Sequence, residues 1–381
     1  MIRIDSKLPN VGTTIFSVMS ALAREHQAIN LSQGFPDFDM SGRLQDLVTD
    51  AMRNGHNQYA PMTGLPALCE RIIQKNYRLY GAIQDAATEI TITNGASQAI
   101  FTAIGAFIRP DDEVILVEPC YDCYRPAIEL AGGRVVVYET SAPDFAVDWA
   151  AYAQLITPKT KMLLINNPQN PSASVFSAAD WQAIARLTVG TDILILSDEV
   201  YEHLVYDGAA HQSIFRFPEL WERTIATYSF GKTFHNTGWK IGYVAAPDYL
   251  MQEIRKVHQF NVFSVTTPFQ YALAEFLADE NEYLQLPDFY QQKRDAFAAM
   301  LALTRLELLP CKGTYFQVVT YKNISDERDT DFAVRLVKEF GVAAIPISGF
   351  YHSHKDEKLI RLCFAKTNRT LEQAAERLMK L

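Results

Sequence analysis

Short apolar runs rich in valine, isoleucine and leucine recur through the middle of the chain. They cover residues 114–117, 134–138, 162–165, 193–196 and 224–228. Helical stretches, such as residues 177–188, lie between several of them. Near-continuously apolar strands that alternate with helices indicate a mainly parallel sheet with helices on both faces. We therefore expect an α/β fold.

The pattern changes beyond Pro247, where helical periodicity dominates. We expect helices at 248–259, 268–279, 288–304, 330–340 and 368–381, and strands at 314–320, 342–348 and 359–365. This mixture favours a second, smaller α+β domain. We expect residues 1–45 to form an N-terminal arm and part of the small domain, residues 46–285 the large domain, and residues 286–381 the rest of the small domain.

Composition narrows the function classes. Of 381 residues, 48% are hydrophobic and 21% charged, with a net charge of −9. These values are typical of a globular enzyme and argue against nucleic acid or an anionic membrane as the main partner. The start of the chain carries Arg3, Asp5 and Lys7 and has no apolar core of a signal peptide. The longest apolar helical stretch, 99–108, is too short to span a bilayer.

Five scattered cysteines suit a reducing compartment, so we expect a cytoplasmic protein. Cys120 and Cys123 have CxxC spacing, which we interpret as incidental. No second Cys/His pair is spaced to complete a zinc site, so we expect no metal.

Chemically distinctive side chains follow the strand ends. In parallel sheets, ligands bind where the carboxyl ends of the strands meet. The residues found there are an aromatic, an amide, a carboxylate, a phenol, a hydroxyl and a lysine: Tyr121, Asn170, Asp198, Tyr201, Ser229 and Lys232. This convergence is a stronger signal than any one of the motifs.

Lys232 is placed on a turn between two β-type segments inside an apolar region. Lysine is rarely buried unless it forms an ion pair or takes part in chemistry. A buried lysine of lowered pKa commonly forms a Schiff base with a carbonyl. The expected carbonyl compound is pyridoxal 5'-phosphate. The alternative is a surface hairpin that carries two solvated lysines, Lys232 and Lys240.

A phosphate site is expected at residues 94–99, where a strand turns directly into a helix. The free N–H groups and the dipole of the helix N-terminus attract anions, and Ala96 and Ser97 permit close approach. Ser229 and Lys240 would complete the cradle. The stretch is neither a Walker loop nor GxGxxG, so a nucleotide is not indicated. A βα turn without a ligand is the alternative.

The other strand-end residues also suit this cofactor. A carboxylate such as Asp198 keeps a pyridine nitrogen protonated, so that the ring accepts electrons. Tyr201 and Asn170 can hydrogen-bond the ring 3′ oxygen, and Tyr121 can stack on the ring. The alternatives are a helix cap for Asp198 and core packing for the two tyrosines.

Arg361 interrupts an apolar strand, so it should be paired or should bind an anion. Its planar fork suits a substrate carboxylate, and an internal salt bridge is the alternative. The loop 30–39 contains Gly34, where the backbone can approach a ligand closely; a plain connecting turn is the alternative.

These motifs, in this order, resemble the class I aminotransferases of the fold-type I pyridoxal-phosphate family, nearest the kynurenine, glutamine and methionine aminotransferases. The resemblance covers nearly the whole chain. It rests on the stretches NLSQGFPDF at 30–38, YAPMTG at 59–64, NGAS at 94–97, NPQNP at 167–171, SDEVY at 197–201, SFGK at 229–232 and RLCFA at 361–365.

The resemblance implies a role for each matching residue. Lys232 would carry the Schiff base and the proton, and Asp198 would pair with the pyridine nitrogen. Tyr59 would reach the phosphate of the other subunit, which implies a homodimer with shared sites. Three sets of implied roles agree with those above: ring contacts for Tyr121, Asn170 and Tyr201; the phosphate cradle for Ala96, Ser97, Ser229 and Lys240; and the α-carboxylate site for Arg361 and Gly34. The resemblance alone adds Asn170 to the α-carboxylate site and places Phe16 and Phe263 in the side-chain pocket.

Three departures from the family pattern matter. Lys240 stands where many relatives have arginine, so it would grip phosphate as a point charge. Ser97 and Gln98 replace a larger aromatic and a glycine of kynurenine-type relatives, and Ser264 replaces a histidine of some. The last two changes put a kynurenine preference in doubt.

The expected activity is transfer of an α-amino group from an L-amino acid to a 2-oxo acid. A pocket lined by Phe16, Tyr59 and Phe263 favours methionine or aromatic substrates over dicarboxylates. A carbon–sulfur β-lyase on the same fold is one alternative. A cofactor-binding regulator without turnover is another, although no DNA-binding extension is visible in the sequence.

Overall fold

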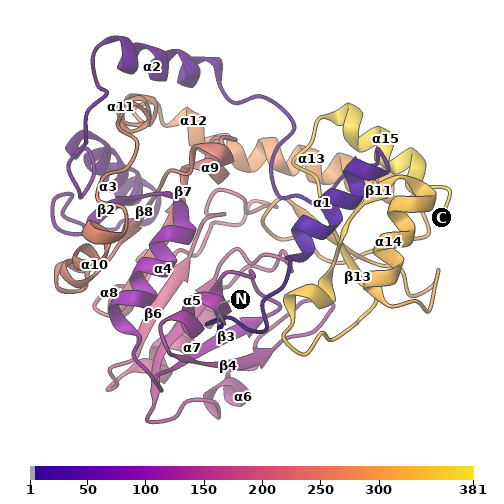
Figure 1. The fold of residues 1–381 in the computed structure, drawn as a ribbon, viewed down its shortest axis with the longest axis horizontal. Coiled ribbons are helices and arrows are strands. Elements are labelled where there is room, and N and C mark those ends of the chain that lie inside the picture. Colours follow the sequence, from indigo (N-terminus) through magenta and orange to yellow (C-terminus); the bar gives the residue numbers. More distant parts are fainter. Residues whose placement is uncertain (1–4) are drawn as a thin grey trace.

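The computed structural model describes residues 5–381. Arg3, which entered the expectation about a signal peptide, lies outside this range, as do the first four residues of the expected arm. Two sheets dominate the architecture, a large one toward the N-terminal half and a small one toward the C-terminus (Figure 1). Within residues 5–381, no helix is both long and apolar enough to cross a membrane. The domain boundaries at residues 45 and 285 stay a prediction, and so does the cytoplasmic location.

The large sheet has seven strands and is mostly parallel, as expected. Only β8 runs antiparallel to its neighbours β2 and β7. In spatial order the strands are β2 (Ile90–Thr93), β8 (Gly242–Ala245), β7 (Thr224–Ser229), β6 (Leu194–Asp198), β5 (Thr160–Asn166), β3 (Glu113–Glu118) and β4 (Arg134–Glu139).

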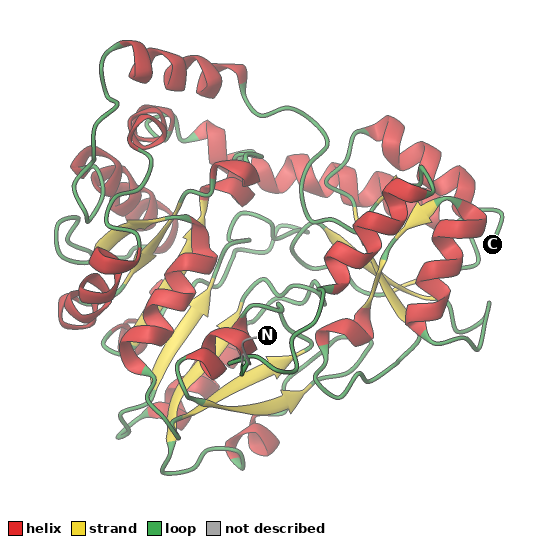
Figure 2. Ribbon diagram, in the orientation of Figure 1, coloured by secondary structure: helices red, strands yellow, loops and turns green. Residues whose placement is uncertain are grey.

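Helices cover both faces of this sheet, which is why its central strands are apolar throughout (Figure 2). One face packs against α3 (Pro66–Tyr80), α7 (Ala178–Thr188) and α11 (Thr267–Phe276). The other packs against α4 (Gly95–Phe107), α5 (Tyr124–Leu130) and α10 (Asp248–Asn261). The other helices in this part of the chain are α2 (Gly42–Arg53), α6 (Trp149–Ala153), α8 (Pro218–Trp221), α9 (Phe230–Thr233) and α12 (Asn281–Leu284).

The small sheet is antiparallel and has the order β12 (Ile345–Pro346), β13 (Leu359–Cys363), β10 (Phe316–Thr320) and β9 (Glu307–Leu308). A separate parallel pair joins β1 (Ile29–Asn30) to β11 (Val342–Ala343). Through this pair the N-terminal helix α1 (Ile15–Glu25) lies beside the C-terminal elements (Figure 1). The helices of this part are α13 (Leu286–Leu301), α14 (Asp329–Phe340) and α15 (Asn368–Leu378).

Two local expectations were wrong. The single strand expected at 342–348 is two short strands, β11 and β12, in different sheets. Pro346 has no N–H to donate and ends β12 at the edge of its sheet. The turn expected around Lys232 is a one-turn helix, α9, which follows β7 directly.

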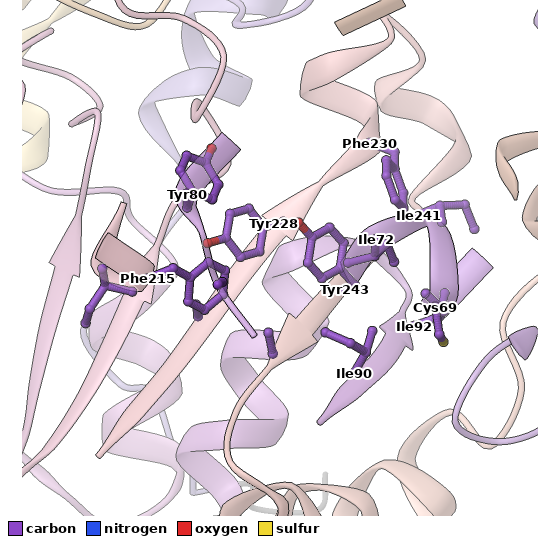
Figure 3. Close-up of a cluster of buried hydrophobic side chains, with 14 of the residues drawn as sticks. Cys69, Ile72, Tyr80, Ile90, Ile92, Phe215, Tyr228, Phe230, Ile241 and Tyr243 are labelled. Atoms are coloured by element: carbon purple, nitrogen blue, oxygen red, sulfur yellow. The ribbon is translucent and has the colours of Figure 1, made fainter. Parts of the chain in front are cut away.

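A buried polar cluster lies between α3 and the large sheet. The Lys75 ammonium contacts the Glu202 carboxylate, and the Tyr80 hydroxyl donates to Glu202 Oε2 at 2.6 Å. The Lys75 Nζ also lies 5.2 Å from the ring centroid of Tyr228 and 5.5 Å from that of Tyr243. Figure 3 shows the rings of Tyr80, Tyr228 and Tyr243 gathered here. Burial would raise the pKa of Glu202, but Lys75 and His203 hold it well below its usual value.

We predict that Glu202→Gln strongly destabilises the protein, because it leaves the Lys75 charge buried without its counterion. Breaking a buried ion pair typically costs about 3–5 kcal/mol. Thermal unfolding measures the loss. Glu280→Gln is the control, because Glu280 pairs with Arg78 on the surface at 3.3 Å and such pairs contribute about 1 kcal/mol or less. Equal unfolding temperatures for both variants would contradict this account.

Candidate active site

The carboxyl ends of β5, β6 and β7 face the small sheet across one cavity of about 370 Å³. Its wall contains twelve of the fourteen residues predicted from the sequence: Phe16, Gly34, Ala96, Ser97, Tyr121, Asn170, Asp198, Tyr201, Ser229, Lys232, Lys240 and Arg361. The other two, Tyr59 and Phe263, lie outside it. The cavity therefore joins side chains that are more than three hundred residues apart in sequence.

Lys232 projects from α9, immediately after β7. Its Nζ donates to the Gly34 carbonyl oxygen at 2.9 Å and to the Tyr315 hydroxyl at 3.0 Å. Burial lowers the pKa of this amine to about 8, and the nearby cations Arg361 and Lys240 lower it further. The surface-hairpin alternative is thereby excluded for Lys232, although Lys240 is exposed in the single chain.

Asp198 ends β6, the strand next to β7, and its side chain is buried. The Tyr124 hydroxyl donates to Asp198 Oδ2 at 2.5 Å, and the Val200 N–H donates to Oδ1 at 3.3 Å. Burial raises the pKa of Asp198 to about 6, while these two hydrogen bonds act in the opposite direction. Asp198 caps no helix, because the following residues form a turn.

Arg361 lies at the centre of β13 and is fully buried. One guanidinium nitrogen donates to the Asn170 side-chain oxygen, and the other donates to the Ser32 carbonyl at 3.1 Å. Its Cζ lies 3.8 Å from the ring centroid of Phe316 and 5.4 Å from that of Phe16. Within residues 5–381 these two partners are neutral, no carboxylate forms an ion pair with this guanidinium, and its Nε is buried without a partner. The group is therefore poised to bind an anion rather than to complete an internal salt bridge.

The expected anion cradle forms at the N-terminus of α4. Asn94 precedes the helix, and its side chain makes no capping hydrogen bond. The first N–H groups of α4 are therefore not occupied by a cap. Gly95 has φ of +74°, and a Cβ there would lie 3.3 Å from the Nζ of Lys240. A Cβ on Gly242 would lie 2.3 Å from the Tyr228 carbonyl oxygen and 3.1 Å from the Ala96 nitrogen. Positions 95 and 242, which border the cradle, therefore require glycine.

Together these groups fit pyridoxal 5'-phosphate. The cradle and Lys240 match a phosphate, Asp198 matches a ring nitrogen, and the lowered pKa of Lys232 suits an amine that attacks a carbonyl carbon. The ring of Tyr121 also lines the cavity and stands edge-on to Tyr124, with centroids 5.7 Å apart.

Tyr59 and Phe263 instead form an exposed aromatic pair. Their ring centroids are 5.5 Å apart, with exposed fractions of 82% and 46%. Within one chain, therefore, neither ring contributes to the cavity.

Sequence reasoning missed Tyr124 and Tyr315. Tyr124 comes three residues after Tyr121 at the same strand end, so its position was a usable signal. Tyr315 gave none, because it was part of an expected strand in which an aromatic residue is ordinary.

Comparison with known proteins decides the family. The sequence profile described as aminotransferase class I and II matches residues 26–378. The chain belongs to this family. The family expected from the motifs is confirmed, together with the α/β fold and the reaction class, transfer of an amino group.

Individual relatives match along the whole chain. A methionine aminotransferase of Escherichia coli (strain K12) is 52% identical over 377 residues, covering 99% of this chain and 98% of that protein. A solved Escherichia coli structure described as having a methionine aminotransferase function superposes with a TM-score of 0.98 at 51% identity, with 100% of both chains covered. The human kynurenine–oxoglutarate transaminase 1 is 34% identical over 394 residues, covering 94% of this chain and 93% of that protein.

We predict that Asp198→Asn stabilises the cofactor-free aminotransferase at neutral pH. The pKa of Asp198 is about 6 in the folded chain and about 3.9 when unfolded, so the folded state binds this proton more tightly. Stability from this group is therefore fully present below the unfolded pKa and is lost as pH rises through the folded value. At pH 7 the substitution should add about 2 kcal/mol.

Thermal unfolding of the cofactor-free protein at pH 7 and near pH 4 measures this effect. The difference between the variant and the native chain should shrink toward pH 4. A difference independent of pH, or a less stable variant at pH 7, would contradict a pKa of Asp198 that burial raises.

Proposed function

We propose that this aminotransferase uses pyridoxal 5'-phosphate to move the α-amino group of L-methionine, or of an aromatic L-amino acid, to a 2-oxo acid. One observation carries the proposal: the Lys232 amine, with its lowered pKa, shares a cavity with the carboxylate of Asp198 and the guanidinium of Arg361. The identity to a methionine aminotransferase supports the choice of donor.

The proposed cofactor contacts follow the geometry. Ala96, Ser97, Ser229 and Lys240 would hold the phosphate, and Tyr121 would contact the ring face. Asp198, fixed by Tyr124, would hold the ring nitrogen protonated, while Tyr201 and Asn170 would bind the 3′ oxygen. When bound, this cofactor supplies a sink for the electron pair left by the substrate Cα–H bond.

Lys232 is the proposed covalent anchor and the proton carrier. With a pKa of about 8, a fraction of its amine is neutral near pH 7 and able to accept a proton. The released amine takes the substrate α-proton at Nζ and later returns it to a neighbouring carbon. Because one site serves donor and acceptor in turn, the kinetics should be ping-pong.

The substrate side of the cavity explains the preference for uncharged side chains. Arg361 would bind the α-carboxylate, with Asn170 and the Gly34 backbone beside it. Among residues 5–381, Arg361 is the only arginine in the cavity wall, so none of them is left for a distal carboxylate, and the wall does contain the acidic Asp122. Phe16 adds an apolar surface. A side chain such as that of methionine therefore suits this wall better than that of glutamate.

A homodimer would complete the site. The exposed rings of Tyr59 and Phe263 lie outside their own cavity, and Phe260 nearby in sequence is 86% exposed. Aromatic residues at this exposure are typical of interfaces. We infer that Tyr59 serves the cofactor phosphate of the partner subunit and that Phe263 lines the partner's substrate pocket. A fully active monomer, detected by light scattering at assay concentration, would contradict this inference.

A half-reaction tests the proposed function. We predict that L-methionine, mixed with the enzyme loaded with cofactor and without acceptor, removes the visible absorbance band until a 2-oxo acid is added. L-glutamate should act about tenfold or more slowly, because no arginine of residues 5–381 other than Arg361 lines the cavity to pair with its distal carboxylate.

Product analysis separates the alternatives. A carbon–sulfur lyase would restore the band by itself, with ammonia and pyruvate released from cystathionine. A regulator would leave the band unchanged with every amino acid tried. Either result would overturn the proposed function.

A further inference from the structure

The Lys232 amine, the Gly34 carbonyl oxygen and the Tyr315 hydroxyl form a triangle of hydrogen bonds. Nζ donates to the Gly34 carbonyl oxygen at 2.9 Å and to the Tyr315 hydroxyl at 3.0 Å, and that hydroxyl donates to the same Gly34 oxygen at 2.6 Å. Tyr315 directly precedes β10 of the small sheet and is completely buried. None of the cofactor or substrate contacts proposed above uses its hydroxyl.

The directions of these hydrogen bonds favour the charged amine. Burial raises the pKa of Tyr315 well above its usual value, so the phenol stays neutral. Its one proton is engaged by Gly34, which leaves its lone pairs to accept from Nζ. The Gly34 oxygen can only accept. Both oxygens therefore stabilise an ammonium at Nζ and oppose the effect of burial.

Neither acceptor can move far. The Tyr315 ring stands edge-on to Tyr201, with centroids 5.2 Å apart, and packs beside Phe316 at 4.9 Å. A Cβ on Gly34 would lie 2.8 Å from Phe316, so the loop is tight against the small sheet at this point. The triangle is a rigid receptor for the lysine side chain.

We propose that Tyr315 is a positioning residue for Lys232: its hydroxyl, with the Gly34 carbonyl, receives the lysine amine whenever that amine is not bound to the cofactor. This inference rests on the proposed function of Lys232. In the proton-transfer step the substrate Cα–H bond breaks, its proton forms a new N–H bond at Nζ, and its electron pair remains with the substrate and bound cofactor. The triangle fixes the direction from which Nζ approaches and holds the ammonium that results.

Other charged and titratable groups also act on Nζ. These are Asp198 on β6, Arg361 and Cys363 on β13, Lys240 after α9, and the tyrosines Tyr201 and Tyr315. Tyr315→Phe changes none of these charges, because the lost group is neutral. It removes one hydroxyl, which contacts the Tyr201 hydroxyl as well as Lys232 and Gly34.

The chain offers a matched control. Tyr290 on α13 is also completely buried, and its ring centroid lies 5.8 Å from that of Tyr315. Its hydroxyl has no hydrogen-bond partner within residues 5–381. Tyr290→Phe therefore removes a hydroxyl from the same aromatic cluster without touching Lys232.

The first readout does not depend on turnover. The enzyme is loaded with pyridoxamine phosphate, which leaves the Lys232 amine free, and is pulsed with a small acylating reagent across a pH series. Mass spectrometry then gives the modified fraction of the Lys232 peptide. In Tyr315→Phe the pH at which labelling of Lys232 is half-maximal should fall by about one unit, because a hydrogen bond to the ammonium is lost. Tyr290→Phe should match the native enzyme.

The second readout is the isotope effect of α-deuterated L-methionine in a single turnover. A misplaced amine slows proton transfer, so Tyr315→Phe should show a larger effect, with kcat about tenfold lower and KM little changed. If the phenylalanine variant loses its fold or its cofactor, Tyr315→Met repeats both measurements with another apolar side chain.

Unchanged labelling midpoint and isotope effect in Tyr315→Phe would overturn the proposal, and so would equal changes in Tyr290→Phe. Failure of the proposed function looks different. In that case native enzyme would not respond to L-methionine at all, whereas the labelling midpoint would still report whether the Tyr315 hydroxyl holds Lys232.

Discussion

The buried amine of Lys232 is the constraint on which the rest of the site depends. Removing an amine from water favours its neutral form, which suits a nucleophile and a base. The amine must still be held, and the two acceptors that hold it, Gly34 and Tyr315, come from outside the large sheet. The site therefore exists only because the small sheet and the N-terminal loop close over the carboxyl end of β7.

Strand order then supplies the other reacting groups. β6 is the neighbour of β7, so Asp198 lies beside Lys232 without any contribution from a distant loop. The side chains that follow Asp198 point to two different sides of the segment. Asp198 and Tyr201 face the cavity, whereas Glu199 and Glu202 are buried in polar clusters: Glu199 accepts from Ile214 N–H at 2.9 Å and contacts His211 at 2.9 Å. These clusters hold residues 198–202 in place from the side away from the cavity. A buried ion pair is weak evidence for stability, but it is well suited to holding a loop in one position.

Much of this arrangement was predictable from the sequence because parallel sheets obey a simple rule. Apolar runs locate the strands, and the residues that follow them meet at one edge, which was enough to bring Lys232, Asp198, Tyr201 and Asn170 together. Arg361 stood out because a charge inside an apolar strand needs a partner. The sequence could not indicate Tyr315, whose hydroxyl matters only through a contact between distant segments. For Tyr59 the family resemblance already implied a role in the other subunit, which agrees with its place outside its own cavity. The position of Phe263 outside the cavity was beyond reach, since pattern assigns a residue to a loop but not to a subunit.

The account stands on Lys232 as the reacting amine, and the most direct test is chemical. Borohydride reduction of the purified enzyme loaded with cofactor, followed by peptide mapping, locates the side chain to which the cofactor was joined. The account predicts the added mass on the peptide that contains Lys232, and no added mass there in Lys232→Ala. Attachment at Lys240 or another lysine, or turnover retained by Lys232→Ala, would contradict it.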